Sequence, residues 1–285
     1  MFNSRLDEIF KAQLSQDEFD KLSRFIYKES GIKMPPVKRI MLQSRLQKRL
    51  RELNMASYKE YIDYVFSTEG LNGEIIHMLD VVSTNKTDFF REPIHFDFLV
   101  QTALPELIQQ RGANRTVKIW SAGCSSGEEP YTIAMVLADF AEKNPGFDFS
   151  IIGTDISTQI LQKAADAVYK EDRVSIIPLE TKRKYFLRSK DRTNPTVKVS
   201  PNLRKKVRFG RLNFMDTYYD IPETFDVVFC RNVLIYFDRE TQAKVIQKLC
   251  EKLRPDGYFF LGHSESIMNM QVPLKQVKPT IFKRI

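Results

Sequence analysis

The most informative segment of this chain is Lys118-Ile-Trp-Ser-Ala-Gly-Cys-Ser-Ser-Gly-Glu-Glu-Pro-Tyr-Thr-Ile-Ala134. The apolar residues from Val117 to Trp120 predict a buried strand, and the small residues from Gly123 to Gly127 predict a turn. Pro130, which suits the first turn of a helix, and the apolar spacing through Leu137 predict a helix after that turn. Open α/β sheets bind nucleotides at such turns, at the carboxyl ends of parallel strands. An ordinary turn that binds nothing is the alternative.

Two functional interpretations of this turn compete. Gly123-Cys-Ser-Ser-Gly127 matches the G-x-S-x-G nucleophile elbow of the α/β-hydrolases, for which His263 and either Asp226 or Asp238 would complete a triad. No HGGG-type oxyanion segment precedes the turn, however, and the glutamates directly after the serines would oppose a developing oxyanion. These features favour a site for a nucleoside cofactor.

The charges around the turn indicate which nucleoside fits. Such a site needs an acid after the next strand to bind the ribose hydroxyls, and Asp155 supplies it, 28 residues beyond Gly127. The G-x-G-x-x-G pattern of dinucleotide sites is absent, and Glu128 and Glu129 in the first helical turn would repel a phosphate. A cofactor with positive charge and no phosphate fits better, so the sequence points to S-adenosylmethionine and a methyltransferase.

Further motifs extend along the chain. They are Ser83-Thr-Asn-Lys-Thr-Asp-Phe-Phe-Arg-Glu92, the Ser121 to Ala134 segment, Asp155, Asn213, Phe229-Cys-Arg-Asn-Val-Leu-Ile-Tyr-Phe-Asp238 and Pro255-Asp-Gly-Tyr-Phe-Phe-Leu-Gly-His-Ser-Glu265. Together they resemble the chemotaxis receptor glutamate methyltransferases, the CheR family, and the resemblance covers nearly the whole chain.

The resemblance implies an α/β fold in which a small, all-helical N-terminal domain precedes an open, mostly parallel, doubly wound sheet. Such a Rossmann-like sheet is typical of S-adenosylmethionine-dependent methyltransferases. We expect a receptor-recognition domain at 1–75, a linker that contributes to the cofactor site at 76–92, and a methyltransferase domain at 93–285 with a basic β insertion at about 182–206. Strands are expected near 117–122, 150–154, 206–210, 225–230 and 257–262, with a final segment near 279–283.

The implied reaction transfers a methyl group from S-adenosylmethionine to glutamate side chains of a methyl-accepting chemoreceptor, giving methyl esters and S-adenosylhomocysteine. A glutamate carboxylate is already an anionic nucleophile at neutral pH, so catalysis needs positioning and no general base. We expect Arg91 to hold the incoming carboxylate, because a guanidinium can bind both oxygens, and the Tyr236 hydroxyl to orient it. A core position for Tyr236, beside Phe237, is the alternative.

The resemblance also implies a set of cofactor-binding residues. Asn85, Thr87 and Arg91 lie in a connection that covers the cofactor in the family. The alternative is that these polar residues cap a helix that begins near Phe89. Asp155 is expected to bind the ribose hydroxyls, and Asn213 to reach the adenine. The full expected set is Asn85, Thr87, Arg91, Gly123, Glu129, Asp155, Asn213, Phe214, Arg231 and Asn232. His263 is expected to be a hydrogen-bonded core residue.

A basic helix is predicted between Val37 and Leu53. Leucines at helical spacing form an apolar stripe, and a basic arc is expected opposite it. The resemblance implies that this arc docks on the acidic, helical methylation region of a receptor, and a solvated face is the alternative. The leucines are Leu42, Leu46, Leu50 and Leu53, and the basic residues are Lys38, Arg45, Lys48, Arg49 and Arg51.

A second basic segment spans residues 182–211, with twelve lysines or arginines and Asp191 as its one acid. Short β-type runs around Asn194-Pro195 predict a small exposed β insertion. In the family, such a subdomain can tether receptor tails through a glycine-containing loop. No glycine lies between Lys182 and Phe209, so the sequence leaves tethering open.

The composition adds expectations about partners and location. The net charge of +8 suggests an acidic partner surface, and the three cysteines lack metal-type spacing, so reduced thiols and no metal site are expected. No apolar run reaches the length of a membrane span, and no signal-peptide core is visible. We therefore expect a cytoplasmic monomer that reaches the membrane only through its receptor.

Two other functions remain as alternatives. The basic segments suggest an RNA or other nucleic-acid methyltransferase, although Arg231-Asn-Val-Leu stands where enzymes that methylate base amino groups usually carry N/D-P-P-Y/F. A regulatory protein that binds the cofactor without catalysis is the third possibility. The motifs favour the receptor methyltransferase, with no nucleic-acid partner.

Overall fold

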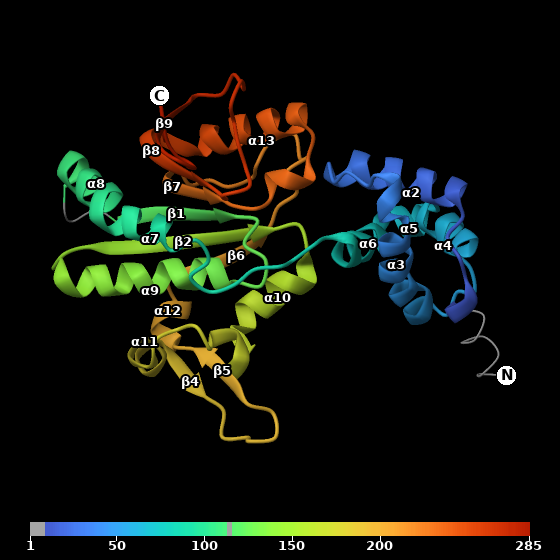
Figure 1. Ribbon diagram of the computed structural model, residues 1–285, viewed down its shortest axis with the longest axis horizontal. Helices are drawn as coiled ribbons and strands as arrows, with labels where there is room; N and C mark the ends of the chain where they lie inside the picture. The colour runs from blue at the N-terminus through green and yellow to red at the C-terminus, as the bar shows by residue number, and fades with distance from the viewer. Residues whose placement is uncertain (1–8, 113–115) are drawn as a thin grey trace.

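The computed structural model describes residues 9–112 and 116–285, which form a helical part and a sheet part (Figure 1). Residues 1–8 of the domain expected at 1–75 lie outside the described residues. The connecting segment, residues 83–93, runs from α6 (Glu74–Val82) along the edge of the sheet to α7 (Ile94–Phe98). None of the helices within the described ranges combines the length and apolar character that a membrane span needs.

Local sequence signals set both ends of the first long helix, α2 (Gln16–Ser30). The Ser15 hydroxyl accepts the Glu18 N–H at 3.3 Å and the Glu18 carboxylate accepts the Ser15 N–H at 2.8 Å, which is a capping box. Gly31 ends the helix at φ 72°, in the left-handed region. The helical part continues with a 3-10 turn (Pro36–Lys38), α3 (Arg39–Leu53), α4 (Tyr58–Val65), α5 (Thr68–Asn72) and α6.

One basic residue of α3 is buried, contrary to expectation. The leucine stripe lies in the core of the helical part, with Leu53 only partly buried. Arg49 follows Leu42 by seven residues, close to two full helical turns, so it shares the buried face. Its guanidinium binds both carboxylate oxygens of Glu74 at 2.7 Å, and the Tyr61 hydroxyl donates to the same carboxylate at 2.9 Å. The expectation that Arg49 faces a receptor is therefore wrong.

The sheet part contains a seven-stranded, mostly parallel sheet, which confirms the expected fold class. Its order is β6-β2-β1-β7-β8-β10-β9, and β10 pairs antiparallel with both of its neighbours. The edge strand β9 was not expected, because its side chains are mostly polar and exposed and carry no alternating pattern. The strands are β1 (Thr116–Ala122), β2 (Asp148–Asp155), β6 (Val207–Arg211), β7 (Phe225–Cys230), β8 (Leu253–Leu261), β9 (Leu274–Lys278) and β10 (Ile281–Arg284).

Alternating side chains give the sheet two apolar faces. On one face, Ile119 and Phe229 belong to a core shared with α7, a π-helical turn (Leu99–Ala103), α8 (Leu104–Arg111) and α9 (Glu128–Lys143). On the other face, Trp120 and Val228 share a core with α13 (Arg239–Lys252). In Figure 1, α9 and α13 accordingly lie on opposite sides of the sheet. Helix α10 (Thr158–Asp166) contacts β2, β6 and α6, so it links the sheet to the helical part.

The basic insertion is a separate three-stranded antiparallel sheet of order β3-β5-β4. It begins at Val168, earlier than the expected residue 182, because β3 joins it from the segment after α10. That strand has three residues and buries only Tyr169, so it carries no periodic signal. The elements here are β3 (Val168–Lys170), a 3-10 helix (Glu171–Val174), α11 (Leu179–Tyr185), β4 (Phe186–Arg188), β5 (Thr196–Val199) and α12 (Pro201–Arg204).

Replacing Glu74 with glutamine is expected to destabilise the protein. The buried Arg49 guanidinium would lose its charged partner, and breaking a buried ion pair in this way lowers the free energy of unfolding by about 3 kcal/mol. Urea denaturation measures the change. Glu69→Gln, at an exposed position of α5, is the matched control and should change stability by less than about 0.5 kcal/mol. Equal effects of the two substitutions would contradict the importance of this ion pair.

Candidate functional site

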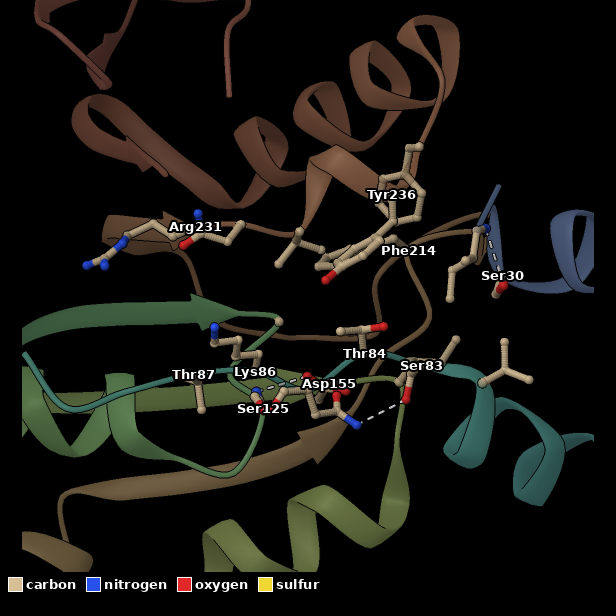
Figure 2. Close-up of a pocket in the computed structure, with 18 of the residues that line it drawn as sticks. Ser30, Ser83, Thr84, Lys86, Thr87, Ser125, Asp155, Phe214, Arg231 and Tyr236 are labelled. Atoms are coloured by element: carbon tan, nitrogen blue, oxygen red, sulfur yellow. Dashed lines mark hydrogen bonds between the residues drawn. The ribbon is translucent and has the colours of Figure 1, made fainter. Parts of the chain in front are cut away.

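A large cavity lies where the helical part, the connecting segment and the carboxyl edge of the sheet meet (Figure 2). The open space between its walls, counted together with the solvent at its mouth, is about 1060 Å³. Figure 2 shows Tyr236 and Phe214 on one side of the cavity, with Ser125 and Asp155 on the other. The turns that follow β1, β2 and β7 all contribute to the lining, as expected for an open parallel sheet.

The lining includes every residue that the sequence analysis assigned to the cofactor, and both residues assigned to catalysis. It also includes Lys38, which was expected to bind a receptor. The structure thus gathers distant segments into one site, while the individual roles remain predictions. The shared residues are Asn85, Thr87, Arg91, Gly123, Glu129, Asp155, Asn213, Phe214, Arg231, Asn232 and Tyr236.

Asp155 organises the turn after β1. One carboxylate oxygen accepts the Ser125 N–H at 2.9 Å, and the other accepts the Ser157 N–H at 3.0 Å. Burial raises the pKa of Asp155, and these N–H groups oppose the rise. Gly123, at φ 83°, passes so close to Val233 that a Cβ atom would lie 2.4 Å from a Val233 methyl carbon. The turn therefore presents close-packed backbone and a buried carboxylate to the cavity.

A buried charge network lies beside this turn. The Arg231 side chain is 2% exposed, and its Nε lies 3.4 Å from Glu92 Oε2 and 3.5 Å from Glu129 Oε2. Its Nη2 donates to the Arg91 carbonyl. Burial raises the pKa of Glu129, while the Arg231 charge and a 2.7 Å hydrogen bond from Ser121 oppose the rise. Arg231 thus connects the end of β7 to the connecting segment and to α9.

Hydrogen bonds hold the connecting segment against the sheet part. The Ser125 hydroxyl donates to the Asn85 carbonyl at 3.1 Å. Arg173 donates to the Thr87 carbonyl and pairs with Asp88 at 3.0 Å. Helix α7 begins only at residue 94, so these polar residues do not cap it. The segment is instead fixed across the carboxyl edge of the sheet.

The helical part closes the opposite side of the cavity, a contribution that the sequence analysis missed. The Glu29 carbonyl accepts the Asn213 side-chain amide at 2.6 Å, and the Lys33 N–H donates to the Tyr236 carbonyl at 3.0 Å. The break at Gly31 predicted a turn here, but nothing in it indicated which surface the turn would meet. The additional lining residues from this region are Ser30, Ile32, Met34 and Met41.

The basic arc of α3 is narrower than expected. Arg45 donates to the carbonyls of Val82 and Ser83, so part of its guanidinium holds the start of the connecting segment. Burial lowers its pKa. Lys48, with 53% of its side chain exposed, and Arg51 do face solvent. Arg45 is therefore partly buried, and its expected role in receptor binding stays a prediction.

The contacts do not support the hydrolase alternative. Asp226, at the start of β7, binds Arg254 at 2.6 Å, and Asp238 caps α13. His263 is not the expected core residue, because 55% of its side chain is exposed. His95 is the buried histidine, and burial lowers its pKa to about 4. Both candidate acids are thus engaged in structural contacts.

The chemistry of the lining suits a cofactor that carries positive charge and hydroxyl groups. Glu129 and Asp155 provide two largely buried carboxylates, which can bind an ammonium group and ribose hydroxyls. The start of α9 already holds the buried Glu128 carboxylate, which pairs with Arg173 at 2.9 Å, so a phosphate would have to compete with a fixed anion there. These residues fit S-adenosylmethionine, which has an ammonium, a sulfonium and ribose hydroxyls but no phosphate.

Comparison with known proteins identifies the family. Residues 17–83 match the all-alpha domain of CheR methyltransferases, and residues 85–282 match their S-adenosylmethionine-binding domain. The chain is 38% identical over 274 residues to the chemotaxis protein methyltransferase of Borreliella burgdorferi, covering 95% of each chain. It is 35% identical over 258 residues to that of Escherichia coli, covering 90% of this chain and 87% of the relative. The chain therefore belongs to the CheR methyltransferase family, and its cofactor is S-adenosylmethionine.

Proposed function

We propose that this methyltransferase esterifies specific glutamate side chains on the cytoplasmic domain of chemoreceptors, acting as a cytoplasmic monomer that reaches the membrane only through its receptor. The observation that carries the proposal is the composition of the cavity. One lining combines carboxylates suited to the cofactor, Glu129 and Asp155, with a partly exposed arginine suited to an anionic acceptor, Arg91. The relatives named chemotaxis protein methyltransferase support the same pathway.

The proposed division of roles follows the charges. Glu129 binds the ammonium group of the cofactor, and Asp155 binds the ribose hydroxyls. Asn213 and Phe214 contact the adenine, while Gly123, Arg231 and Asn232 shape the remainder of the pocket and Asn85 and Thr87 cover it. When bound, S-adenosylmethionine supplies an electrophilic methyl group on a sulfur that departs as a neutral thioether.

Arg91 is the proposed holder of the acceptor carboxylate. Its backbone carbonyl is engaged by Arg231, while its side chain makes a 3.3 Å hydrogen bond to the Lys86 carbonyl and retains other donors. A guanidinium can bind both carboxylate oxygens and limit their rotation, and orientation of this kind is a main source of rate acceleration when no proton transfer is needed. The Tyr236 hydroxyl lies in the same lining and completes the proposed positioning.

The proposed receptor-docking surface centres on the outward residues of α3. Lys48 and Arg51 project from the helix, and Lys38 lies beside the cavity. An acidic receptor helix that contacts these residues would place its glutamates near the mouth of the cavity. Arg45 and Arg49 support this surface from within by holding the connecting segment and α6.

The nucleic-acid alternative loses support from the basic segment 182–211. Several of its basic residues form ion pairs within the fold, which reduces the positive field available for a phosphate backbone. The pairs are Lys184 with Asp139 and Glu142, Arg188 with Glu171, Lys206 with Asp148, and Arg208 with Glu223. An acidic protein surface is the better-supported partner.

Transfer of tritiated methyl groups tests the proposed acceptor. Incubation of the protein with labelled S-adenosylmethionine and receptor-bearing membranes should label the receptor, and mild base should release the label, because carboxyl methyl esters hydrolyse readily. Membranes without chemoreceptors are the control and should stay unlabelled. A base-stable label, or one carried by nucleic acid, would contradict a carboxylate acceptor.

Substitution of Arg91 tests its positioning role. Arg91→Ala should lower turnover about 10–100-fold, the value of one or two charge-assisted hydrogen bonds, and change cofactor affinity less than about threefold. The backbone contact to Arg231 is kept in the variant. Arg91→Lys, which keeps the charge but not the two-pronged geometry, should fall between wild type and alanine. Losses of equal size in turnover and cofactor affinity would refute an acceptor role.

The pH dependence of cofactor binding tests Glu129. Its raised pKa means that it takes up a proton at a higher pH than an exposed glutamate, so the charge facing the ammonium group disappears as pH falls through that pKa. Calorimetry should therefore show weaker binding at pH 5 than at pH 7.5. Glu129→Gln should bind the cofactor about tenfold more weakly at pH 7.5. Its affinity should also depend less on pH than that of the wild type, and the pH dependence that is left should come from Asp155.

Glu142→Gln is the matched control for that experiment. Glu142 lies on the same helix, α9, but its side chain is 62% exposed and pairs with Lys184. It should leave both the affinity and its pH profile unchanged. A Glu129→Gln profile that overlays the wild-type profile would remove Glu129 from the ammonium site.

A further inference from the structure

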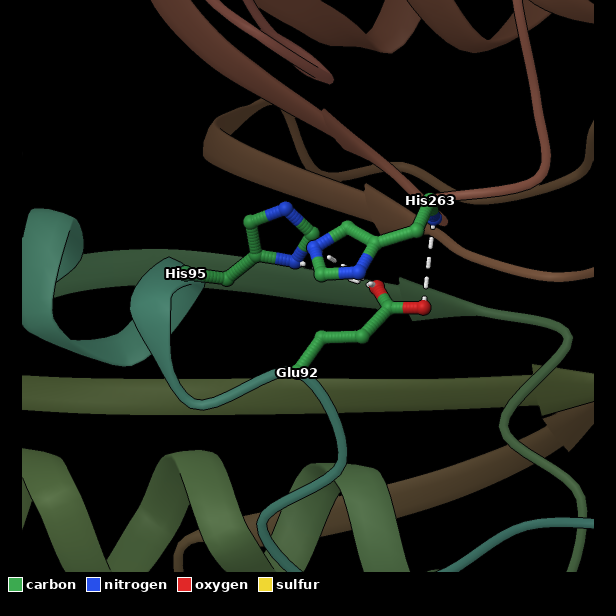
Figure 3. A group of neighbouring side chains, drawn as sticks. All are labelled: Glu92, His95 and His263. Carbon is green, nitrogen blue, oxygen red and sulfur yellow. Dashed lines mark hydrogen bonds and ion pairs between the residues drawn. The ribbon is translucent and has the colours of Figure 1, made fainter.

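Three side chains capable of binding a metal gather outside the cofactor cavity (Figure 3). Glu92 comes from the connecting segment, His95 from α7 and His263 from the loop after β8. One potential ligand atom from each lies within 4.8 Å of the other two. His95 is fully buried and the Glu92 side chain is 10% exposed, while His263 reaches the surface.

The hydrogen bonds of His95 determine which ring nitrogen faces the cluster. The Thr280 hydroxyl lies 2.7 Å from the Pro279 carbonyl and 2.8 Å from His95 Nε2, and we assign its hydrogen to the carbonyl, so that Nε2 donates to the hydroxyl. The neutral ring then has no hydrogen on Nδ1. This bare nitrogen lies 3.5 Å from Glu92 Oε2, and neither atom has a hydrogen-bond partner within the described part of the chain.

Two lone pairs that face each other in a buried place repel unless a cation lies between them. The observed spacings suit such a cation. Ligand atoms about 2.1 Å from a tetrahedral zinc ion are roughly 3.4 Å apart. Nδ1 of His95 lies 3.5 Å from Glu92 Oε2, and Nε2 of His263 lies 4.0 Å from it, so only the exposed His263 side chain must shift.

We propose that Glu92 Oε2, His95 Nδ1 and His263 Nε2 form a binding site for one divalent transition-metal ion, with Zn²⁺ as the representative ligand. Two imidazoles and one carboxylate favour Zn²⁺ and similar ions over Mg²⁺ or Ca²⁺, which prefer oxygen ligands. The fourth position is open to water. The Thr280 hydroxyl is hydrogen-bonded to the His95 ring, and the backbone N–H of His263 donates to Glu92 Oε1 at 3.2 Å. Hydrogen bonds of this kind orient the ligands in metal sites.

The site is coupled to the cofactor cavity through Arg231. Its Nε lies 3.4 Å from the same Glu92 oxygen and 3.5 Å from Glu129. Because the ion and this guanidinium would share Glu92, binding is expected to be weaker than at a closed structural site with four protein ligands. No metal was expected from the cysteine spacing. Glu92 and His95 have the Glu-x-x-His spacing of some metal sites, but His263 follows His95 by 168 residues, so the sequence did not bring the three together.

Calorimetric titration of the metal-free, untagged full chain with ZnCl₂ tests the proposal. The wild type should bind one ion per chain, and His263→Ala should weaken binding at least about tenfold. The substitution removes an exposed side chain and keeps the backbone bond to Glu92, so thermal unfolding without metal should be unchanged. His77→Ala is the matched control, because His77 is exposed on α6 and is the one histidine of the sequence outside the proposed site. It should bind Zn²⁺ like the wild type.

Nuclear magnetic resonance of the histidine rings provides a second measurement. The chain has three histidines, so their ring resonances can be told apart. Zn²⁺ should shift the resonances of His95 Nδ1 and His263 Nε2 and leave both nitrogen resonances of His77 unchanged. The proposal is overturned by the absence of Zn²⁺ binding in the wild type. It is equally overturned if His263→Ala binds as tightly as the wild type, or if only the His77 resonances shift.

Discussion

The buried guanidinium of Arg231 is the interaction on which the arrangement of the site depends. It lies between two carboxylates, Glu92 and Glu129, and its Nη2 holds the Arg91 carbonyl. A buried cation without partners is strongly unfavourable, so these groups must stay together whenever the protein is folded. Since they come from the residue after β7, from α9 and from the connecting segment, one charge balance fixes three segments at the carboxyl edge of the sheet.

Several residues at that edge adopt a costly backbone conformation. Glu92, Ser125 and Asn232 lie at φ 56°, 49° and 60°, in the left-handed region that non-glycine residues rarely occupy. At Glu92 the conformation accompanies a carboxylate that faces Arg231, and at Ser125 an N–H that faces Asp155. The surrounding contacts therefore maintain backbone strain where the cofactor cavity and the Glu92 cluster adjoin.

The helical part completes the same cavity from the other side. Asn213 binds the Glu29 carbonyl and Tyr27 donates to Asp238 at 2.5 Å, so the end of α2 is fixed to the loops of the sheet part. The outward basic residues of α3 belong to this same helical part. A partner that contacted them would meet the cavity at a distance set by the fold.

Features encoded within a few neighbouring residues were predictable from the sequence: the β1 turn, the capped end of α2 and five main strands. The expected cofactor residues that line the cavity followed from the resemblance to the family and not from local patterns. Features that depend on partners far along the chain were not. Arg49 was misplaced although helix geometry alone puts it on the face of Leu42, whereas its partner Glu74 lies in another helix. Arg45, β3, the cavity lining from Ser30 to Met41 and the Glu92 cluster likewise took their positions from tertiary contacts. Local periodicity and turn chemistry act between neighbours and can be recognised in one segment, but the burial of a charge or the meeting of two histidines is determined only when packing brings separate segments together.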